Sequence, residues 1–359
     1  MKPSRICLAR GYLLASTLTA LLYPRASNAA SNYSFQTLDN QADPTFNQLL
    51  GINDAGTIAG YFGVGSAANP NKGYTVAPPY GPASYTNENF PASAQTQVVG
   101  INSNTSPTTV GFWVDNNANN FGFVKQGNTL TSVTNPNTPT ANTVVNQLLG
   151  VNNKNVAVGF YTDGNGDSQA YSYDIAGAKF AAITLPGSFN AIMTTATGIN
   201  DAGVISGFYL DATGNAHGFL DNAGTFSSFD DPAGAGMNTS FLGLNNNGEV
   251  VGSFVDATGV TNGLSYNWLT NTWTTVNDPN SSANPAFDVT GTTINGVNDA
   301  GQLVGFYSDG TNVDGFLATP VPEPASFAFV AAGLLICGWT SRLLAARRPR
   351  VAAPGGDQP

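Results

Sequence analysis

The sequence predicts an all-β fold, a closed six-bladed β-propeller of four-stranded blades, over residues 31–320. One pattern recurs six times at intervals of 45 to 53 residues. Each interval holds four short strand-like stretches, which is typical of a propeller blade. The chain is also rich in turn residues, with 41 Gly and 21 Pro, and only 9% of its residues are charged. Another closed or stacked all-β array is the alternative.

Each repeat begins with Gly, an aliphatic residue and Asn, and a second Gly follows before a pair that is mostly aromatic. Examples are Gly51, Asn53 and Gly60; Gly198, Asn200 and Gly207; and Gly296, Asn298 and Gly305. The other repeats start at Gly100, Gly150 and Gly243. The stretch before the Asn reads as a first strand, such as 194–199, and 204–209 reads as a second. Between them, Asn-Asp-Ala-Gly favours a hairpin turn, because Gly accepts a positive φ.

A third strand follows about 20 residues after the first Gly of each repeat, and a fourth strand leads into a Pro-rich or Asp-rich turn. The stretch 33–39 resembles such a fourth strand, whereas the last repeat stops after its third strand, near Leu317. We therefore expect the N-terminal strand to complete the sixth blade. This closure removes exposed sheet edges from the ring.

The N-terminal segment, residues 1–30, has the features of a signal peptide. Lys2, Arg5 and Arg10 form a positive region, and an apolar stretch follows over 11–23. Ser27-Asn28-Ala29 supplies the small residues that a signal peptidase requires. The sequence therefore predicts export.

The C-terminal segment, residues 321–359, combines three features. Val321, Pro322, Glu323 and Pro324 precede 17 uncharged residues, 325–341, long enough for a short transmembrane helix. A basic cluster follows, made of Arg342, Arg347, Arg348 and Arg350. By the positive-inside rule this cluster stays cytoplasmic, which places the repeats outside the membrane.

This order of motif, span and Arg cluster resembles the PEP-CTERM sorting signal. The resemblance implies an exosortase, a membrane-embedded enzyme, as processing partner, and a Gram-negative bacterium that makes exopolysaccharide. The protein would be held transiently in the inner membrane by its C-terminal helix. It would then reach the cell surface or the extracellular biofilm matrix.

The repeat itself, together with Ala216-His217-Gly218-Phe219, resembles the HAF repeat of extracellular bacterial proteins. The resemblance covers most of residues 33–319. It implies an extracellular repeat protein, and it transfers no catalytic residue.

Composition excludes several functions. Residues 31–320 contain four Lys, no Arg and 20 acidic residues, so a nucleic-acid partner is not expected. The absence of Arg excludes the Arg cluster with which sialidases hold a carboxylate. The single His, His217, cannot form a His-rich zinc site, and we expect it at the surface of a blade edge. Cys7 and Cys337 lie in the end segments, so residues 31–320 have no thiol.

One loop has the alternating oxygen ligands of a calcium site, namely Asp163, Asn165 and Asp167. No Glu follows at the bidentate position, so a solvated turn is the better interpretation. Calcium is the alternative, and the sequence predicts no other cofactor.

The recurring aromatic pairs, such as Phe160 and Tyr161, should point to opposite faces of their strand. One ring would pack between blades while the other faces a neighbour or the channel.

The leading functional hypothesis is a non-catalytic binding or scaffold module of the exopolysaccharide matrix, whose partners are exopolysaccharide or surface proteins. The acidity favours neutral glycans or cation-bridged partners. The alternative is a hydrolase or lyase acting on the same matrix, since two of the 20 acids could form a catalytic pair. A protein-binding face on the ring is a third hypothesis.

Overall fold

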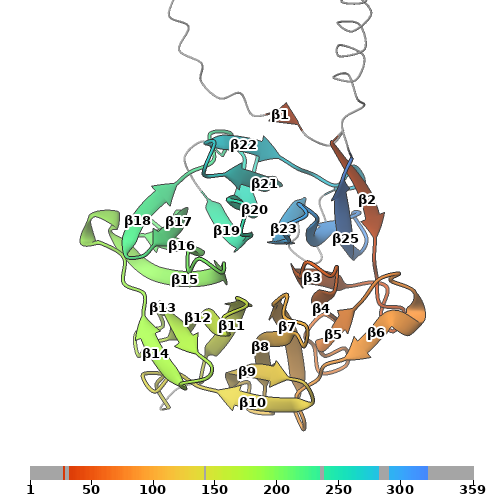
Figure 1. The fold of residues 1–359 in the computed structure, drawn as a ribbon, viewed down its shortest axis with the longest axis horizontal. Helices are drawn as coiled ribbons and strands as arrows, with labels where there is room; N and C mark the ends of the chain where they lie inside the picture. Colours follow the sequence, from red (N-terminus) through yellow and green to blue (C-terminus); the bar gives the residue numbers. More distant parts are fainter. Residues whose placement is uncertain (1–26, 29–31, 141–142, 235–237, 283–290, 322–359) are drawn as a thin grey trace, which may run out of the picture.

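The computed structural model describes residues 27–28, 32–140, 143–234, 238–282 and 291–321. These form six antiparallel sheets arranged around a central axis, with the first strand of each sheet innermost (Figure 1). The prediction of a six-bladed propeller with four-stranded blades is thereby confirmed. Most of the predicted signal peptide and nearly all of the predicted sorting segment, including the transmembrane helix, lie outside the described residues. Within the described part of the chain, no helix has the length and apolar character needed to cross a bilayer.

The blades follow one another along the chain, and each is listed from its innermost strand outward. Blade 1 is β3 (Asn47–Ile52), β4 (Ile58–Phe62), β5 (Lys72–Val76) and β6 (Tyr85–Asn87). Blade 2 is β7 (Gln95–Ile101), β8 (Thr108–Val114), β9 (Asn120–Gln126) and β10 (Thr129–Val133). Blade 3 is β11 (Asn146–Val151), β12 (Val156–Thr162), β13 (Ser168–Asp174) and β14 (Lys179–Ala182).

Blade 4 is β15 (Ala191–Ile199), β16 (Ile205–Asp211), β17 (Ala216–Asn222) and β18 (Thr225–Phe229). Blade 5 is β19 (Thr239–Leu244), β20 (Glu249–Val255), β21 (Thr261–Asn267) and β22 (Thr272–Thr275), beside which β1 (Ser27–Asn28) adds a short parallel strand. Blade 6 is β23 (Thr292–Val297), β24 (Leu303–Ser308), β25 (Val313–Pro320) and β2 (Tyr33–Thr37). Two short 3₁₀ turns, Pro82–Ser84 and Gly187–Phe189, lie in connections between strands.

The ring closes in blade 6, where the N-terminal strand β2 pairs antiparallel with β25. Phe35 lies opposite Ala318, and the backbone N–H of Val321 donates to the carbonyl oxygen of Asn32 at 2.8 Å. The predicted completion of the last blade by the N-terminal strand is thus confirmed. The parallel pairing of β1 with blade 5 was not predicted.

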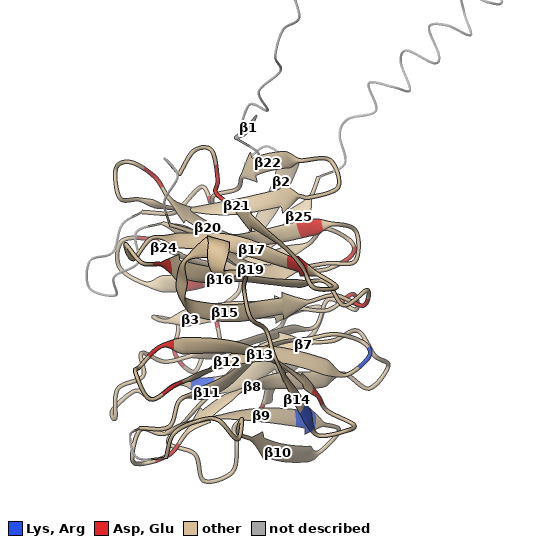
Figure 2. Cartoon of the chain, turned by 90° about the vertical axis from the view of Figure 1, so that its left-hand side faces the viewer, with Lys and Arg blue, Asp and Glu red and all other residues tan. Residues whose placement is uncertain are grey.

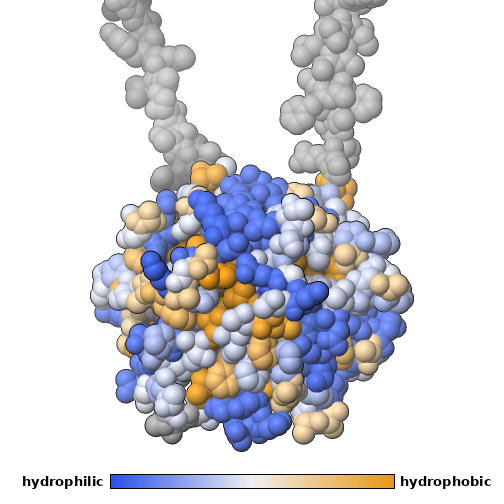
Figure 3. Space-filling view, turned by 60° about the horizontal axis from the view of Figure 1, so that its bottom comes forward, coloured by the Kyte–Doolittle hydropathy of each residue, from blue (hydrophilic) through white to orange (hydrophobic). Residues whose placement is uncertain are grey.

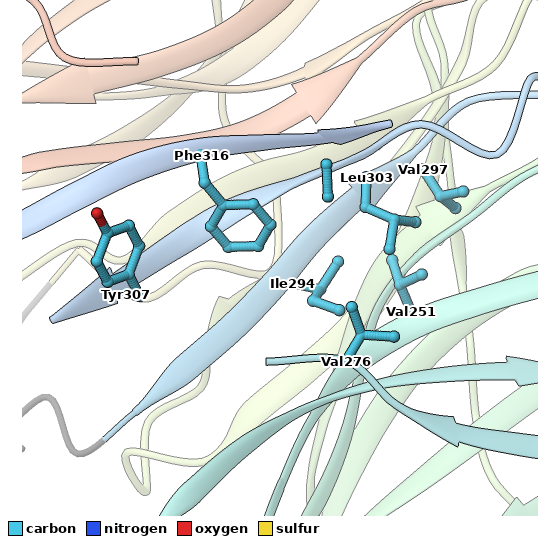
Figure 4. Close-up of a cluster of buried hydrophobic side chains, with 8 residues drawn as sticks. Val251, Val276, Ile294, Val297, Leu303, Tyr307 and Phe316 are labelled. Carbon is cyan, nitrogen blue, oxygen red and sulfur yellow. The ribbon is translucent and has the colours of Figure 1, made fainter. Parts of the chain in front are cut away.

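A buried hydrophobic cluster lies at each of the six interfaces between neighbouring blades. A seventh, made of Phe46, Tyr61 and Val313, adds to the interface of blades 6 and 1. Figure 4 shows the cluster between blades 5 and 6, in which Val251 and Val276 meet Ile294, Leu303 and Phe316. Burial of these side chains is the main force that joins sheets with no covalent link other than the chain itself. Acidic residues lie mainly in loops and at strand ends, outside these clusters (Figure 2).

The turn between the first two strands has the predicted conformation. Gly203 has a φ of +86° and Gly56 one of +78°, and Asn155 takes the same position in blade 3 with a φ of +58°. Glycine tolerates this backbone region at little cost, and Asn is the next most tolerant residue.

Candidate functional site

Each of the six innermost strands carries a β-bulge, and together these bulges shape the centre of the molecule. In each of the six, the pairing register shifts just before the first Gly of the repeat. The extra residue of a bulge is left unpaired, and its side chain is re-aimed. In this propeller the six bulged residues all line one cavity on the axis; they are Leu50, Val99, Leu149, Thr197, Leu242 and Asn295.

Next to the bulges, the first Gly of each repeat forms the narrowest part of the ring. A Cβ on Gly150 would lie 2.7 Å from the carbonyl oxygen of Thr197 and 2.9 Å from the Cα of Gly198. Equivalent contacts join Gly51, Gly100, Gly150, Gly198, Gly243 and Gly296 in a closed circle. The repeat therefore keeps Gly at this position because six backbones meet around the axis.

The Asn of each repeat forms a second closed circle. The side-chain Nδ2 of Asn152 donates to the backbone carbonyl of Asn200 at 3.0 Å. The same bond runs from each blade to the next, through Asn53, Asn102, Asn152, Asn200, Asn245 and Asn298, and returns from Asn298 to Asn53 at 3.1 Å. The Oδ1 of each Asn accepts backbone N–H groups of its own turn; in blade 3, the N–H of Val156 donates to the Oδ1 of Asn152 at 3.0 Å. Each Asn thus fixes both its hairpin and its neighbour.

The second Gly of the repeat, including Gly60, Gly207 and Gly305, faces the carbonyl oxygen of the innermost strand within the same blade. A Cβ there would collide with that strand at the bulge. The predicted repeat residues are therefore brought together as structural rings and do not form a catalytic arrangement.

The central cavity opens on the face opposite the Asn ring and has a volume of about 440 Å³. Gln48, Gln97 and Gln147 project from the innermost strands of blades 1 to 3. Three aromatic rings form the wall on one side, namely Phe112, Phe160 and Phe208 from the second strands of blades 2 to 4. Blade 5 has Ser253 at the equivalent position. The equivalent Tyr61 and Phe306 of blades 1 and 6 pack with Phe46 and Val313 and do not line the cavity, so the aromatic wall is one-sided. Figure 3 shows a face on which hydrophobic surface gathers near the middle and hydrophilic residues surround it.

Some polar atoms of this cavity have no protein partner. The Oδ1 of Asn295 is buried and accepts no hydrogen bond, and the amide of Gln97 makes none to any described residue. In contrast, Gln48 accepts a hydrogen bond from the hydroxyl of Tyr61 at 2.7 Å. A buried polar atom without a partner is costly, so a bound ligand or water that donated a hydrogen bond to the Oδ1 of Asn295 would stabilise the site.

The lining of the cavity includes no Asp, Glu, His, Lys or Arg. Its chemistry is that of carboxamides, hydroxyls and apolar side chains. Such a site can bind and orient a neutral ligand. It lacks the pair of carboxylates that glycoside hydrolysis requires.

In blades 2 to 4 the aromatic pairs after the second Gly divide as predicted between the cavity and a neighbouring blade, whereas in blades 1 and 6 neither aromatic ring lines the cavity. Phe112 and Phe160 line the cavity, whereas Trp113 stacks on Phe90 with centroids 4.6 Å apart and Tyr161 packs beside Tyr171. Phe208 likewise faces the cavity while Tyr209 is buried in the interface of blades 3 and 4.

The candidate calcium loop, Asp163 to Asp167, is the hairpin between β12 and β13. The Oδ1 of Asp163 accepts the backbone N–H groups of Asn165 at 2.8 Å and Asp167 at 3.1 Å, and its Oδ2 accepts Gln169 Nε2 at 3.0 Å. These bonds lower the pKa of Asp163. Asp115, Asp211 and Asp256 make the same turn in blades 2, 4 and 5. Among the described residues, no three acidic, His or Cys side chains are grouped for a metal ion.

His217 is more enclosed than expected for a surface residue at a blade edge, because its side chain is only 15% exposed. Its Nδ1 lies 2.7 Å from Asp230 Oδ1, its Nε2 lies 3.4 Å from Asp211 Oδ2, and its ring stacks on Tyr209.

The Gln residues and the bulged residues of the cavity were not predicted from the sequence. A signal exists, because the residue three places before the first Gly is polar in all six repeats: Gln48, Gln97, Gln147, Thr195, Ser240 and Thr293. A polar residue repeated on the inner strand indicates an axial, solvent-facing position. The bulge that exposes Leu50 and its equivalents carries no comparable signal.

No family model and no curated protein matches the chain. Solved structures with a similar fold exist. The protein assigned as TolB in Agrobacterium tumefaciens aligns with a TM-score of 0.52 at 12% identity, over 81% of this chain and 99% of that one. The fucose-binding lectin of Aleuria aurantia, a six-bladed β-propeller, aligns with a TM-score of 0.47 at 12% identity, over 82% and 98%. A Trypanosoma rangeli sialidase aligns with a TM-score of 0.45 at 7% identity, over 86% and 58%. At such identities the likeness concerns the fold alone.

Proposed function

We propose that this chain is an exported, non-catalytic propeller that binds neutral carbohydrate in its central cavity. The observation that carries the proposal is the lining of that cavity, with three Phe rings on one wall, three Gln amides around it and no ionisable group. Aromatic faces pack against the C–H groups of a sugar ring, and carboxamides hydrogen-bond its hydroxyls. A cavity of about 440 Å³ falls within the range of ligand pockets and suits one or two sugar residues.

The test is co-sedimentation of the purified protein with a panel of insoluble neutral polysaccharides, including glucans, mannans and galactans. Phe160→Ala removes a stacking surface, and Gln97→Ala removes an amide that has no protein partner. Both variants are expected to lose binding, whereas Gln36→Ala, on the exposed outer strand β2, retains it. Absence of binding to every neutral polysaccharide, or binding that survives both cavity variants, overturns the proposal.

We further propose that an exosortase sorts the protein to the cell surface or the exopolysaccharide matrix. The support is the motif from Val321 to Pro324 with its following apolar stretch and Arg cluster. Val321 is 46% exposed at the end of β25, so the motif begins at the edge of the propeller. In a Gram-negative host that has an exosortase, we expect a shortened protein outside the inner membrane. Deletion of residues 322–324 should leave the full-length protein in that membrane, and identical fractionation of both forms refutes the sorting.

A further inference from the structure

A second pocket, of about 400 Å³, lies on blade 1 away from the axis. Its walls come from the ends of β4, β5 and β6 and from the loop that follows β2, elements that lie side by side at the right of Figure 1. Phe62 and Tyr85 are both half-buried and pack against the buried ring of Tyr74, with Tyr85 at 5.2 Å and Phe62 at 6.3 Å between centroids. The pocket therefore has an apolar, aromatic floor.

The rim of this pocket offers hydrogen-bond donors. The Oδ1 of Asn40 accepts the backbone N–H of Ala42 at 3.0 Å, and the Oδ1 of Asn89 accepts that of Gly73 at 3.0 Å. The Oδ1 of Asn87 accepts the N–H of Asn89 at 2.8 Å. A backbone N–H only donates, so these contacts identify the oxygen of each amide. The three Nδ2 groups, which are donors, have no partner among the described residues.

Lys72 adds a positive charge to the same pocket. It is one of only four Lys in residues 31–320, and its ammonium group forms no ion pair with a described residue. Lys125, by comparison, is paired with Glu88. One ammonium group and three amide donors above an aromatic floor match a ligand with one carboxylate, several acceptor oxygens and an apolar face.

We propose that this pocket binds a hexuronic acid residue of an acidic polysaccharide. The Lys72 ammonium pairs with the sugar carboxylate, the Asn amides donate to ring and hydroxyl oxygens, and the sugar's C–H face lies on Phe62 and Tyr85. The single positive charge matches a carboxylate better than a dianionic phosphate. The proposal is independent of the central cavity, because the two pockets share no lining residue.

One nearby acid sets the conditions of the test. The carboxyl of Asp39 interacts electrostatically with Tyr85, and burial raises the pKa of Asp39 to about 7. At pH 6 most of this carboxyl is neutral and repels a uronate little. Binding is therefore measured at pH 6 and low salt, where screening is weak.

The experiment is calorimetric titration of the purified protein with galacturonate oligosaccharides and with the free monosaccharide. Controls are the methyl-esterified oligosaccharide, the neutral galactose oligosaccharide and a short acidic peptide. We expect binding of the uronates only. Lys72→Gln should weaken it about tenfold, the magnitude of one charge-assisted hydrogen bond. Lys72→Arg should retain most of it, and Lys179→Gln, which alters an exposed Lys of blade 3, should change nothing.

Equal binding of the esterified oligosaccharide, or an unchanged affinity in Lys72→Gln, overturns the proposal. Preference for the acidic peptide over the uronates also overturns it and assigns the pocket to protein carboxylates. Because Phe160→Ala alters only the central cavity, uronate binding should persist in that variant, so the failure of one site is distinguishable from failure of the other.

Discussion

Asn152→Ala tests whether the ring of Asn side chains holds the propeller together. Asn152 is buried between blades 3 and 4. Its Nδ2 donates to the carbonyl of Asn200 at 3.0 Å, and its Oδ1 accepts the N–H groups of Lys154 at 3.1 Å and Val156 at 3.0 Å. Alanine removes all three bonds and leaves the Asn200 carbonyl and the Val156 N–H without a side-chain partner.

The expected cost follows from the three lost bonds. The Asn200 carbonyl still accepts the N–H of Gly203 at 3.0 Å, so the Val156 N–H is the group left unsatisfied. An unsatisfied buried group costs about 1–3 kcal/mol and each other lost bond about 1 kcal/mol, so the variant should lose about 3 kcal/mol of unfolding free energy. With an unfolding entropy typical for a domain of this length, that loss lowers the melting temperature by roughly 5 °C. Asn152→Asp keeps the Oδ1 acceptor but places a carboxylate oxygen against the Asn200 carbonyl. At neutral pH it should therefore be destabilised at least as much, which isolates the bond between blades.

The melting temperature is measured by thermal unfolding followed by circular dichroism, and the unfolding free energy by urea titration. Asn117→Ala is the matched control, because Asn117 is exposed and its side chain makes no hydrogen bond to a described residue. If Asn152→Ala unfolds at the temperature of the control, the ring of hydrogen bonds contributes no stability and the reasoning is refuted.

Three further predictions follow from the same structure. Gly150→Ala should lower the unfolding free energy by about 1–3 kcal/mol, because its Cβ would lie 2.7 and 2.9 Å from backbone atoms of blade 4. Gly187→Ala, with open space around it, should have little effect in the same urea titration. The pKa of Asp39 is raised to about 7 by burial and by the nearby charges of Asp314 and Asp309. The unfolded chain therefore releases this proton at a lower pH than the folded chain does, and the unfolding free energy should fall as pH rises from about 4 to about 7. Asp39→Asn keeps an acceptor for the Gly315 N–H, which lies 3.0 Å away in the parent. At pH 8 it should be more stable than the parent by roughly 2 kcal/mol, after a discount for partial exposure. A stability difference between variant and parent that is the same at pH 3.5 and pH 8 contradicts this. The oxygens of Asp163 already accept three hydrogen bonds, two from their own loop and one from Gln169 on β13, so EDTA should leave the melting temperature unchanged. A rise in melting temperature on addition of calcium would instead assign a cation to that loop.

The fold could be predicted from the sequence because its determinants are local and repeated. Gly203 and Asn155 specify a turn by backbone conformation alone, and the Gly and Asn of the repeat recur at one-blade spacing. The missing fourth strand of the last repeat then indicated how the ring closes. Each of these signals lies within one blade or compares one blade with the next.

The candidate binding sites could not be predicted in the same way, because they depend on differences between blades and on backbone irregularities. The bulge that turns Leu50 toward the axis has no residue signature, and the hydrophobic pattern alone assigns this side chain to the core. The pocket of Lys72 depends on Asn40, which arrives from the loop after β2, more than 30 residues away in the sequence. Asp54, Asp201 and Asp299 lie in the hairpin turns that the Asn-Asp-Ala-Gly pattern predicts. Their carboxylates accept backbone N–H groups of neighbouring blades, which only the closed ring shows.

The pairing of β2 with β25 also determines how the propeller responds to mechanical tension. If the protein is tethered beyond Val321, a pull enters the fold through β25, which is hydrogen-bonded to β24 on one side and to β2 on the other. Hydrogen bonds of antiparallel strands run perpendicular to the strand, so a pull along β25 loads two rows of bonds in shear at once. A pull on Asn32 loads only the single row between β2 and β25. The C-terminal side is therefore the mechanically stronger point of attachment.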